Sequence, residues 1–145
     1  MARYEHSDVS FDVPRDWKDR SVVAFTEPSK AGQTTAANVV LTRDTLPKGE
    51  TLRSYADRQL VELAKRMDGF DLRKREEKEL AGREAVELRF GWKGGSGPIE
   101  QRLTMVQGTG GQVLTFTTTV KRSEAAKFDA VFDRILASVK FPDKG

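Results

Sequence analysis

Short runs that read as strands, broken by turns, make up the first 45 residues of the chain, and the later two runs are rich in β-branched residues. Pro14-Arg15-Asp16-Trp17 halts one run, and the stretch Glu27–Gly32 has the composition of a loop between two others. We therefore expect several short strands here. The expected strands are Tyr4–His6, Ser10–Val13, Ser21–Thr26 and Ala36–Arg43.

A helical pattern follows, with apolar residues returning every three or four positions. Thr51 is placed to cap its start, because a threonine hydroxyl can accept from a free backbone N–H of the first turn. Gly69 is placed to end it, since glycine readily takes the left-handed conformation after a helix. The apolar stripe of this helix comprises Leu52, Tyr55, Ala56, Leu60, Leu63 and Met67.

Three or four longer strands are expected next. In Glu84–Lys93 the even positions from Val86 to Trp92 are apolar, while Glu87, Arg89 and Lys93 are charged, which predicts one buried and one solvated face. Ile99–Gln107 and Gln112–Val120 form a further pair. The glycine-rich segments Gly94–Gly97 and Gly108–Gly111 join strand to strand, so they are interpreted as hairpin turns and not as phosphate-binding loops, which lead into a helix.

A second helix is expected after Ser123, which would cap it, and before Pro142. Its apolar face comprises Phe128, Val131, Phe132, Ile135 and Val139. The order of strands, helix, strands and helix predicts an α+β domain, an antiparallel sheet flanked by two main helices. With 145 residues and no repeat or long linker, residues 1–145 are expected to form one domain.

Composition narrows the functional classes. Charged residues make up 32% of the chain, but the net charge is only +3, and the basic run Arg73-Lys74-Arg75 is followed at once by acidic residues, so nucleic-acid binding is not expected. No stretch approaches the ~18 apolar residues of a membrane span, and no secretory leader is evident. We expect a cytoplasmic protein without direct membrane insertion.

Residues able to carry catalysis are scarce. Cysteine is absent, and His6 is the one histidine, placed near the start of the chain as a surface residue. Carboxylate pairs such as Glu76-Glu77 lie in charged segments that lack the apolar surroundings needed to raise a pKa. We therefore predict no catalytic residues, no metal site and no cofactor, and a protein that is not an enzyme.

Two glutamines fall on positions that the pattern marks as apolar. Gln59 lies on the apolar stripe of the first helix, and Gln101 shares the parity of its apolar neighbours on a strand. An unpartnered buried amide costs about 1–3 kcal/mol. Two interpretations are open: each amide bonds to a nearby backbone group or sits at the edge of the stripe, or the two line an apolar recess and offer hydrogen bonds to a partner.

The chain resembles the DcrB-like domain family, and within it the Eag chaperones that accompany type VI secretion effectors. The likeness runs across nearly the whole chain and depends on the order and spacing of several segments. These segments are Phe11-Asp12-Val13-Pro14, Trp17–Phe25, Val40–Asp44, Arg58-Gln59-Leu60, Gly69-Phe70 and Leu80–Ala85.

The resemblance implies a Mog1/PsbP-like fold and a homodimer. It also implies a chaperone or adaptor that shields the hydrophobic N-terminal transmembrane helices of a secreted effector. Val23 stands where the family has asparagine, and Ala24 is smaller than the usual residue. Carried over position by position, the partner-binding residues are Val22, Ala24, Val40, Gln59 and Gln101.

Two other functions remain open. A Mog1-like or PsbP-like domain could bind another protein without interest in membrane helices, and it would be a monomer with no exposed apolar cleft. A hydrolase would need a deep pocket that brings carboxylates together near His6.

Overall fold

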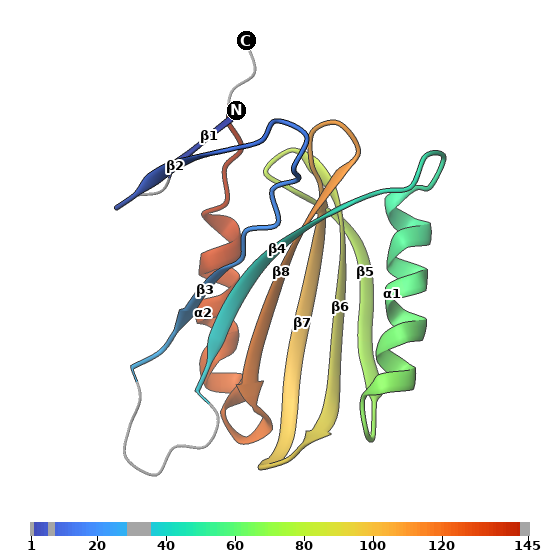
Figure 1. Ribbon diagram of the computed structural model, residues 1–145. Helices are drawn as coiled ribbons and strands as arrows, with labels where there is room; N and C mark the ends of the chain where they lie inside the picture. The colour runs from blue at the N-terminus through green and yellow to red at the C-terminus, as the bar shows by residue number, and fades with distance from the viewer. Residues whose placement is uncertain (1, 6–7, 29–35, 143–145) are drawn as a thin grey trace.

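The computed structural model describes residues 2–5, 8–28 and 36–142. Four short strands come first, then a helix, four long strands and a second helix (Figure 1). His6 lies outside the described residues. The strands are β1 (Ala2–Glu5), β2 (Ser10–Val13), β3 (Val23–Thr26), β4 (Asn38–Thr45), β5 (Asp71–Leu80), β6 (Arg83–Gly94), β7 (Gly97–Gln107) and β8 (Gln112–Lys121), and the α-helices are α1 (Leu52–Arg66) and α2 (Ala125–Ala137).

Six strands form one antiparallel sheet in the order β3-β4-β8-β7-β6-β5, while β1 and β2 pair as a separate hairpin. The two glycine-rich segments join β6 to β7 and β7 to β8, as predicted. Gly110 and Gly111 both have positive φ, which suits a tight turn between strands. An antiparallel sheet flanked by two helices confirms the expected α+β class.

The start of α1 is confirmed, but its end is not where the sequence predicted. Thr51 accepts a hydrogen bond from the Ser54 backbone N–H at 3.1 Å, and the Ser54 hydroxyl returns a contact to the Thr51 backbone N–H. The helix ends at Arg66 because Met67 is already extended. Gly69, with φ +64°, serves the turn into β5 instead of capping the helix.

The start of α2 also differs from the prediction. Arg122–Glu124 form a turn of 3-10 helix, so the α-helix begins at Ala125 with Glu124 at its N-cap. No side chain makes a cap hydrogen bond there, and the Ser123 cap is therefore wrong. The tighter 3-10 geometry starts the turn early and places Ser123 inside it.

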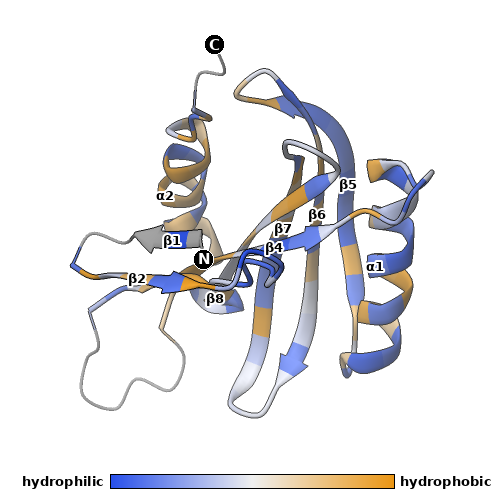
Figure 2. Cartoon of the chain, turned by 45° about the horizontal axis from the view of Figure 1, so that its top comes forward, coloured by the Kyte–Doolittle hydropathy of each residue, from blue (hydrophilic) through white to orange (hydrophobic). Residues whose placement is uncertain are grey.

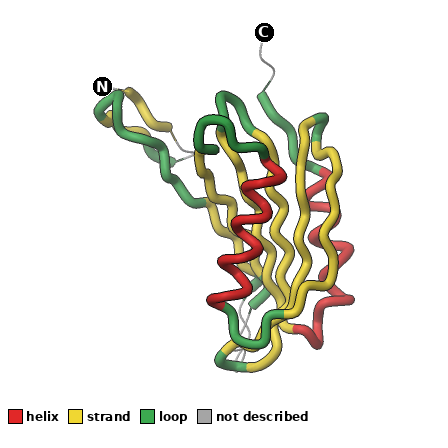
Figure 3. Tube along the Cα trace, turned by 90° about the vertical axis from the view of Figure 1, so that its right-hand side faces the viewer, coloured by secondary structure: helices red, strands yellow, loops and turns green. Residues whose placement is uncertain are grey.

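The two helices cover opposite faces of the sheet (Figure 3). Helix α1 packs on Val86, Leu88 and Phe90 of β6, together with alternate residues of β7. Helix α2 packs on the other face, where Ala85 and Val106 are buried. Alternate side chains of a strand point to opposite faces, so this parity assigns each buried residue to one helix.

Helix α1 covers only part of its face. Its core partners come from β6, β7 and the start of β8, including Leu103 and Met105. Across the rest of that face, on β3, β4 and the remainder of β8, side chains are exposed or half-buried. Figure 1 shows α1 beside β5, with β4 and β3 at the opposite side of the sheet. The fold therefore leaves a half-open sheet face next to a helix.

Candidate functional site

A cavity of about 240 Å³ lies between α1 and the strands β4, β7 and β8. Helix α1 contributes one stripe to its wall, spaced three and four residues apart. The strands contribute side chains from the half-open face. The lining residues are Thr42, Tyr55, Gln59, Leu63, Arg66, Met67, Gln101, Leu103, Met105, Thr115 and Thr117.

Both glutamines singled out by the sequence line this cavity, so the structure brings Gln59 and Gln101 together. Gln59 is half-buried on α1, between the buried side chains of Tyr55 and Leu63. Within the described part of the chain its amide makes no hydrogen bond. Its two donors and its carbonyl oxygen are therefore available to a molecule that enters the cavity.

Gln101 is bound within the fold. The Trp92 indole N–H donates to Gln101 Oε1 at 2.7 Å, and Gln101 Nε2 donates to Thr119 Oγ1 at 2.9 Å. Its partners are thus side chains of β6 and β8. The interpretation that this amide bonds to a nearby backbone group is not what the structure shows. One amide N–H of Gln101 is still available, since each amide carries two.

Ala24 and Val40 reach the same face through the strand register. Ala24 is paired with Val40, Val40 with Thr117, and Thr117 with Leu103. Cross-strand partners point to the same face of a sheet. Because Thr117 and Leu103 line the cavity, Ala24 and Val40 extend its floor toward the β3 edge.

Val22 stands apart from the other predicted site residues. It precedes β3, which begins at Val23, and no cross-strand partner places it in the sheet. Its side chain is 61% exposed. The structure therefore groups Ala24, Val40, Gln59 and Gln101 and leaves Val22 at the exposed edge.

Several lining residues were not predicted. Thr115 and Thr117 alternate along β8 and face the cavity, and Thr42 is paired with Thr115 from β4. Their alternation along the strand is visible in the sequence, but the sequence does not show which sheet face they occupy, because that depends on the side that α1 covers. Threonine offers a methyl group and a hydroxyl, so this floor can contact apolar surface and also accept or donate hydrogen bonds.

The cavity wall contains one charged residue and one tyrosine that is bonded to a charged residue outside the wall. Arg66 lines it from the last turn of α1. Tyr55 lies opposite Asp44, to which its hydroxyl donates at 3.0 Å. Burial, together with this hydrogen bond, raises the pKa of Tyr55 to about 12, so the hydroxyl keeps its proton and donates it in the hydrogen bond to the Asp44 carboxylate.

The arrangement is suited to binding. Apolar side chains supply contact area, and amides and hydroxyls supply hydrogen bonds. Among residues 2–5, 8–28 and 36–142, no group of three or more His, Asp or Glu side chains could hold a metal ion. Neither helix of that part is long and apolar enough to cross a membrane.

Comparison with known proteins places the chain in a family. Residues 8–138 match the DcrB family model, which is most of the sequence. The chain belongs to the DcrB family. A curated relative, Effector EagT6 of Pseudomonas aeruginosa, is 27% identical over 119 residues, which covers 82% of each protein.

Solved structures show the same fold. The DcrB-family chain is similar to PA94, a Pseudomonas aeruginosa protein of unknown function, with a TM-score of 0.83, 23% identity and coverage of 100% and 99% of the two chains. LpqN of Mycobacterium tuberculosis has a TM-score of 0.68 at 15% identity, covering 96% and 88%. PsbP (CyanoP) of Synechocystis sp. PCC 6803 has a TM-score of 0.54 at 13% identity, and the match covers 94% of this chain and 89% of PsbP. These likenesses confirm the Mog1/PsbP-like fold.

Proposed function

We propose that this protein is a non-enzymatic, homodimeric chaperone or adaptor of a type VI secretion effector. It shields the apolar N-terminal transmembrane helices of the effector in the cytoplasm before secretion, and residues 1–145 act as one domain. The similarity to a protein named Effector EagT6 and the membership in the DcrB family support a role beside an effector.

The observation that carries the proposal is the cavity beside α1. From Leu103 and Thr117 in its lining, the strand register continues on the same sheet face to Val40 and Ala24, so a segment longer than one side chain can lie on the half-open face. Burying about 1,000 Å² of an apolar helix contributes roughly 25 kcal/mol gross, before the large cost of association.

Selectivity for a membrane helix would come from the polar side chains of the cavity. Such helices associate through small residues that allow close approach and through hydrogen bonds of Ser, Thr, Asn or Gln across the contact. Gln59 has its full hydrogen-bonding capacity available, and Thr117 lines the same cavity. The predicted cargo is therefore an apolar helix with small and hydroxyl-bearing residues on one face.

Co-expression with the effector tests the role. The transmembrane segment of the effector should stay in the soluble fraction only when this protein is present. Gln59→Glu adds a charge to the cavity and should abolish the effect. Ala64→Glu adds the same charge to an exposed position of α1 and should leave it intact. Equal solubility of the segment without this protein would refute the proposal.

A further inference from the structure

A second cavity, of about 180 Å³, lies on the sheet face that α2 covers, across the sheet from the cavity beside α1. Strands β5 to β8 form its floor, and the N-terminal half of α2 forms one wall. Arg89 is paired with Arg102 across β6 and β7, and Arg102 with Thr118 across β7 and β8. Cross-strand partners point to the same face of a sheet, so these three polar side chains form a row in the cavity.

Two side chains of this row are buried although they are polar. Arg102 is 4% exposed, and its guanidinium donates to Asp133 Oδ1 at 2.6 Å and to Asp129 Oδ1 at 3.4 Å. Thr118 is 2% exposed, and its hydroxyl has no hydrogen-bond partner within the described residues. A buried hydroxyl without a partner destabilises a fold, so a ligand that bonds to it gains an interaction that water does not contest. The cavity therefore offers a buried cation beside a free hydroxyl.

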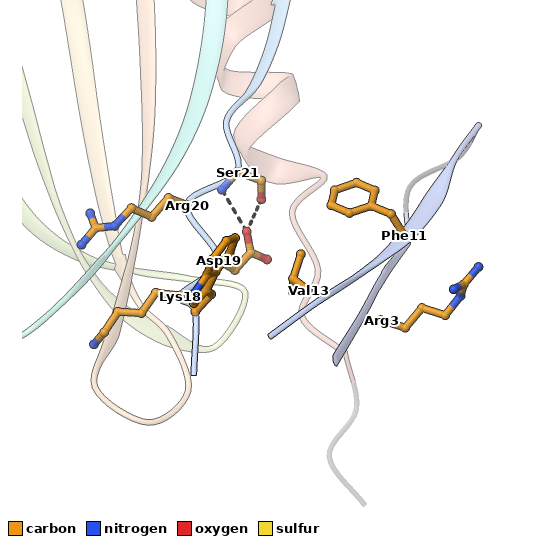
Figure 4. A pocket seen from close by; sticks show the side chains of 8 residues that line it. Arg3, Phe11, Val13, Lys18, Asp19, Arg20 and Ser21 are labelled. Atoms are coloured by element: carbon orange, nitrogen blue, oxygen red, sulfur yellow. Dashed lines mark hydrogen bonds between the residues drawn. The ribbon is translucent and has the colours of Figure 1, made fainter. Parts of the chain in front are cut away.

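The larger cavity beside β2, of about 410 Å³, has no such interior. The side chains that line it are exposed or half-buried. Figure 4 shows Asp19 facing Ser21, whose backbone N–H and hydroxyl donate to the Asp19 carboxylate at 2.9 and 2.6 Å. Arg3 is paired with Asp12 at 2.8 Å. Its charged groups lie in water, where a bond to a ligand only replaces a bond to solvent.

Arg73 reaches the cavity on the α2 face because of two local features. Figure 2 shows its strand, β5, as mostly hydrophilic, and the register with β6 skips Arg73, which marks a β-bulge that re-aims its side chain. The guanidinium crosses Gly91 of β6 and binds Glu100 of β7 through two hydrogen bonds, at 2.6 and 3.2 Å. A Cβ atom at Gly91 would lie 2.6 Å from both groups, so glycine is required at this crossing.

Positive charge and hydrogen-bond donors are in excess in this cavity. Its lining carries three arginines and two carboxylates. Each guanidinium has five N–H groups, and within the described residues Arg89 uses one of them, on Glu87. Buried Glu87 is balanced by Lys78, which it contacts at 3.0 Å. The two aspartates that pair with lining arginines from outside, Asp71 and Asp133, are 63% and 62% exposed, so water screens their charge.

Helix α2 adds to this potential. It begins at Ala125, which lines the cavity, and no side chain caps it. A helix N-terminus has backbone N–H groups without an intrahelical partner and carries a partial positive charge. The helix, the arginines and the Thr118 hydroxyl therefore all favour a ligand that accepts hydrogen bonds and carries negative charge.

We propose that this cavity binds a carboxylate group, held by Arg89, Arg102 and Thr118. A guanidinium can donate to both oxygens of a carboxylate at once. One excess positive charge suits a monoanion better than phosphate, which carries about −1.5 to −2 at neutral pH. The volume equals that of roughly six waters at about 30 Å³ each, which is enough for a carboxylate on a short carbon chain. The group can belong to a small organic acid or to an acidic side chain of a protein.

NMR titration of the full chain with sodium propionate tests this site without any cargo, so it is independent of the proposed function. The Nε–H signals of Arg89 and Arg102 and the amide signals of the first turn of α2 should shift and saturate. Sodium chloride at equal ionic strength should give no saturating shift, because it screens charge without donating an oxygen pair to the guanidinium groups.

The two buried threonines of this face provide a matched pair of variants. Thr118→Val removes the hydroxyl and should weaken propionate binding about tenfold, the loss expected for one hydrogen bond to a charged group. Thr104 is also buried with an unpartnered hydroxyl, but it does not line the cavity, so Thr104→Val should bind propionate as wild type does. Both variants should fold, because each removes a buried hydroxyl that has no partner.

A second probe identifies the source of the carboxylate. It is a peptide with blocked ends that carries one glutamate among glycine and serine residues. Saturation of the same signals at a lower concentration of peptide than of propionate assigns the site to a protein side chain, and the reverse order assigns it to a small organic acid. Either order supports the site. The inference is overturned if neither probe gives a saturating shift, if Thr118→Val and Thr104→Val bind propionate equally, or if inorganic phosphate binds more tightly than propionate.

Discussion

The same substitution at the two cavity glutamines should have different effects on stability. Gln101→Met removes the acceptor of the Trp92 indole N–H and the donor to Thr119. Gln59→Met removes no hydrogen bond within the described residues. Methionine keeps the unbranched length of glutamine, so the comparison isolates the loss of the amide.

The expected magnitudes follow from these contacts. Each lost hydrogen bond costs about 0.5–1.5 kcal/mol net, and the half-buried Trp92 N–H is left without its partner. Gln101→Met should therefore lower the free energy of unfolding by about 1–3 kcal/mol, or the Tm by about 2–4 °C per kcal/mol. Gln59→Met should stay within about 0.5 kcal/mol of wild type.

Urea unfolding followed by far-UV circular dichroism measures both changes. All variants are compared at one protein concentration, because the stability of the proposed dimer would depend on it. The slope m should not change between variants. A cost for Gln59→Met that equals or exceeds that for Gln101→Met would refute the reasoning. In a double-mutant cycle, Trp92→Phe and Gln101→Met should be non-additive by at least about 0.5 kcal/mol.

Three further predictions concern pH and capping. Burial and the hydrogen bond to a carboxylate raise the pKa of Tyr55 to about 12. The stabilisation that this gives the fold is therefore present below pH 10 and is lost as pH rises through about 12. Absorbance near 295 nm should show one late-titrating tyrosine in the wild type and none in Tyr55→Phe. Burial raises the pKa of Glu87, but hydrogen bonds from Arg89 and Lys78 outweigh it and hold the pKa below its usual 4.5, so stability is lost as pH falls through the lowered pKa. As the pH is lowered from 6 to 3, the urea midpoint should therefore fall more steeply for the wild type than for Glu87→Gln. An equal dependence of the midpoint on pH in both proteins would contradict this. Thr51→Ala should lower the free energy of unfolding by about 1 kcal/mol at neutral pH, and an unchanged urea midpoint would argue against the cap.

Much of the fold could be predicted because its pattern is strong. Strand β6 alternates apolar and polar residues, and α1 combines an apolar stripe with Thr51 as a cap. Strand β5 was not identified, because its charged residues leave no apolar face to detect. Ion pairs join it to α1 instead: Arg53 contacts Glu77 at 2.8 Å, and Asp57 pairs with Arg75. Charges of this kind are common on any exposed segment and do not indicate a strand.

The site was predictable only in part for a related reason. Gln59 and Gln101 could be noticed because each interrupts an apolar pattern. That Gln101 bonds to Trp92 depends on the register between β6 and β7, which pairs Gln101 with Phe90 and places Trp92 diagonally. That Thr117 faces the cavity depends on the side of the sheet that α1 covers. Neither register nor layer order can be read from local pattern.

Photo-crosslinking from the cavity floor tests the central claim most directly. Benzoylphenylalanine at Thr117 should crosslink to the transmembrane segment of a co-expressed effector, with the attachment site mapped by mass spectrometry. The same group at Val131, exposed on α2 across the sheet, should not. The predicted result is a crosslink to the apolar segment from position 117 and none from position 131. Equal crosslinking from both positions, or none from Thr117 in a soluble complex, would contradict binding in this cavity.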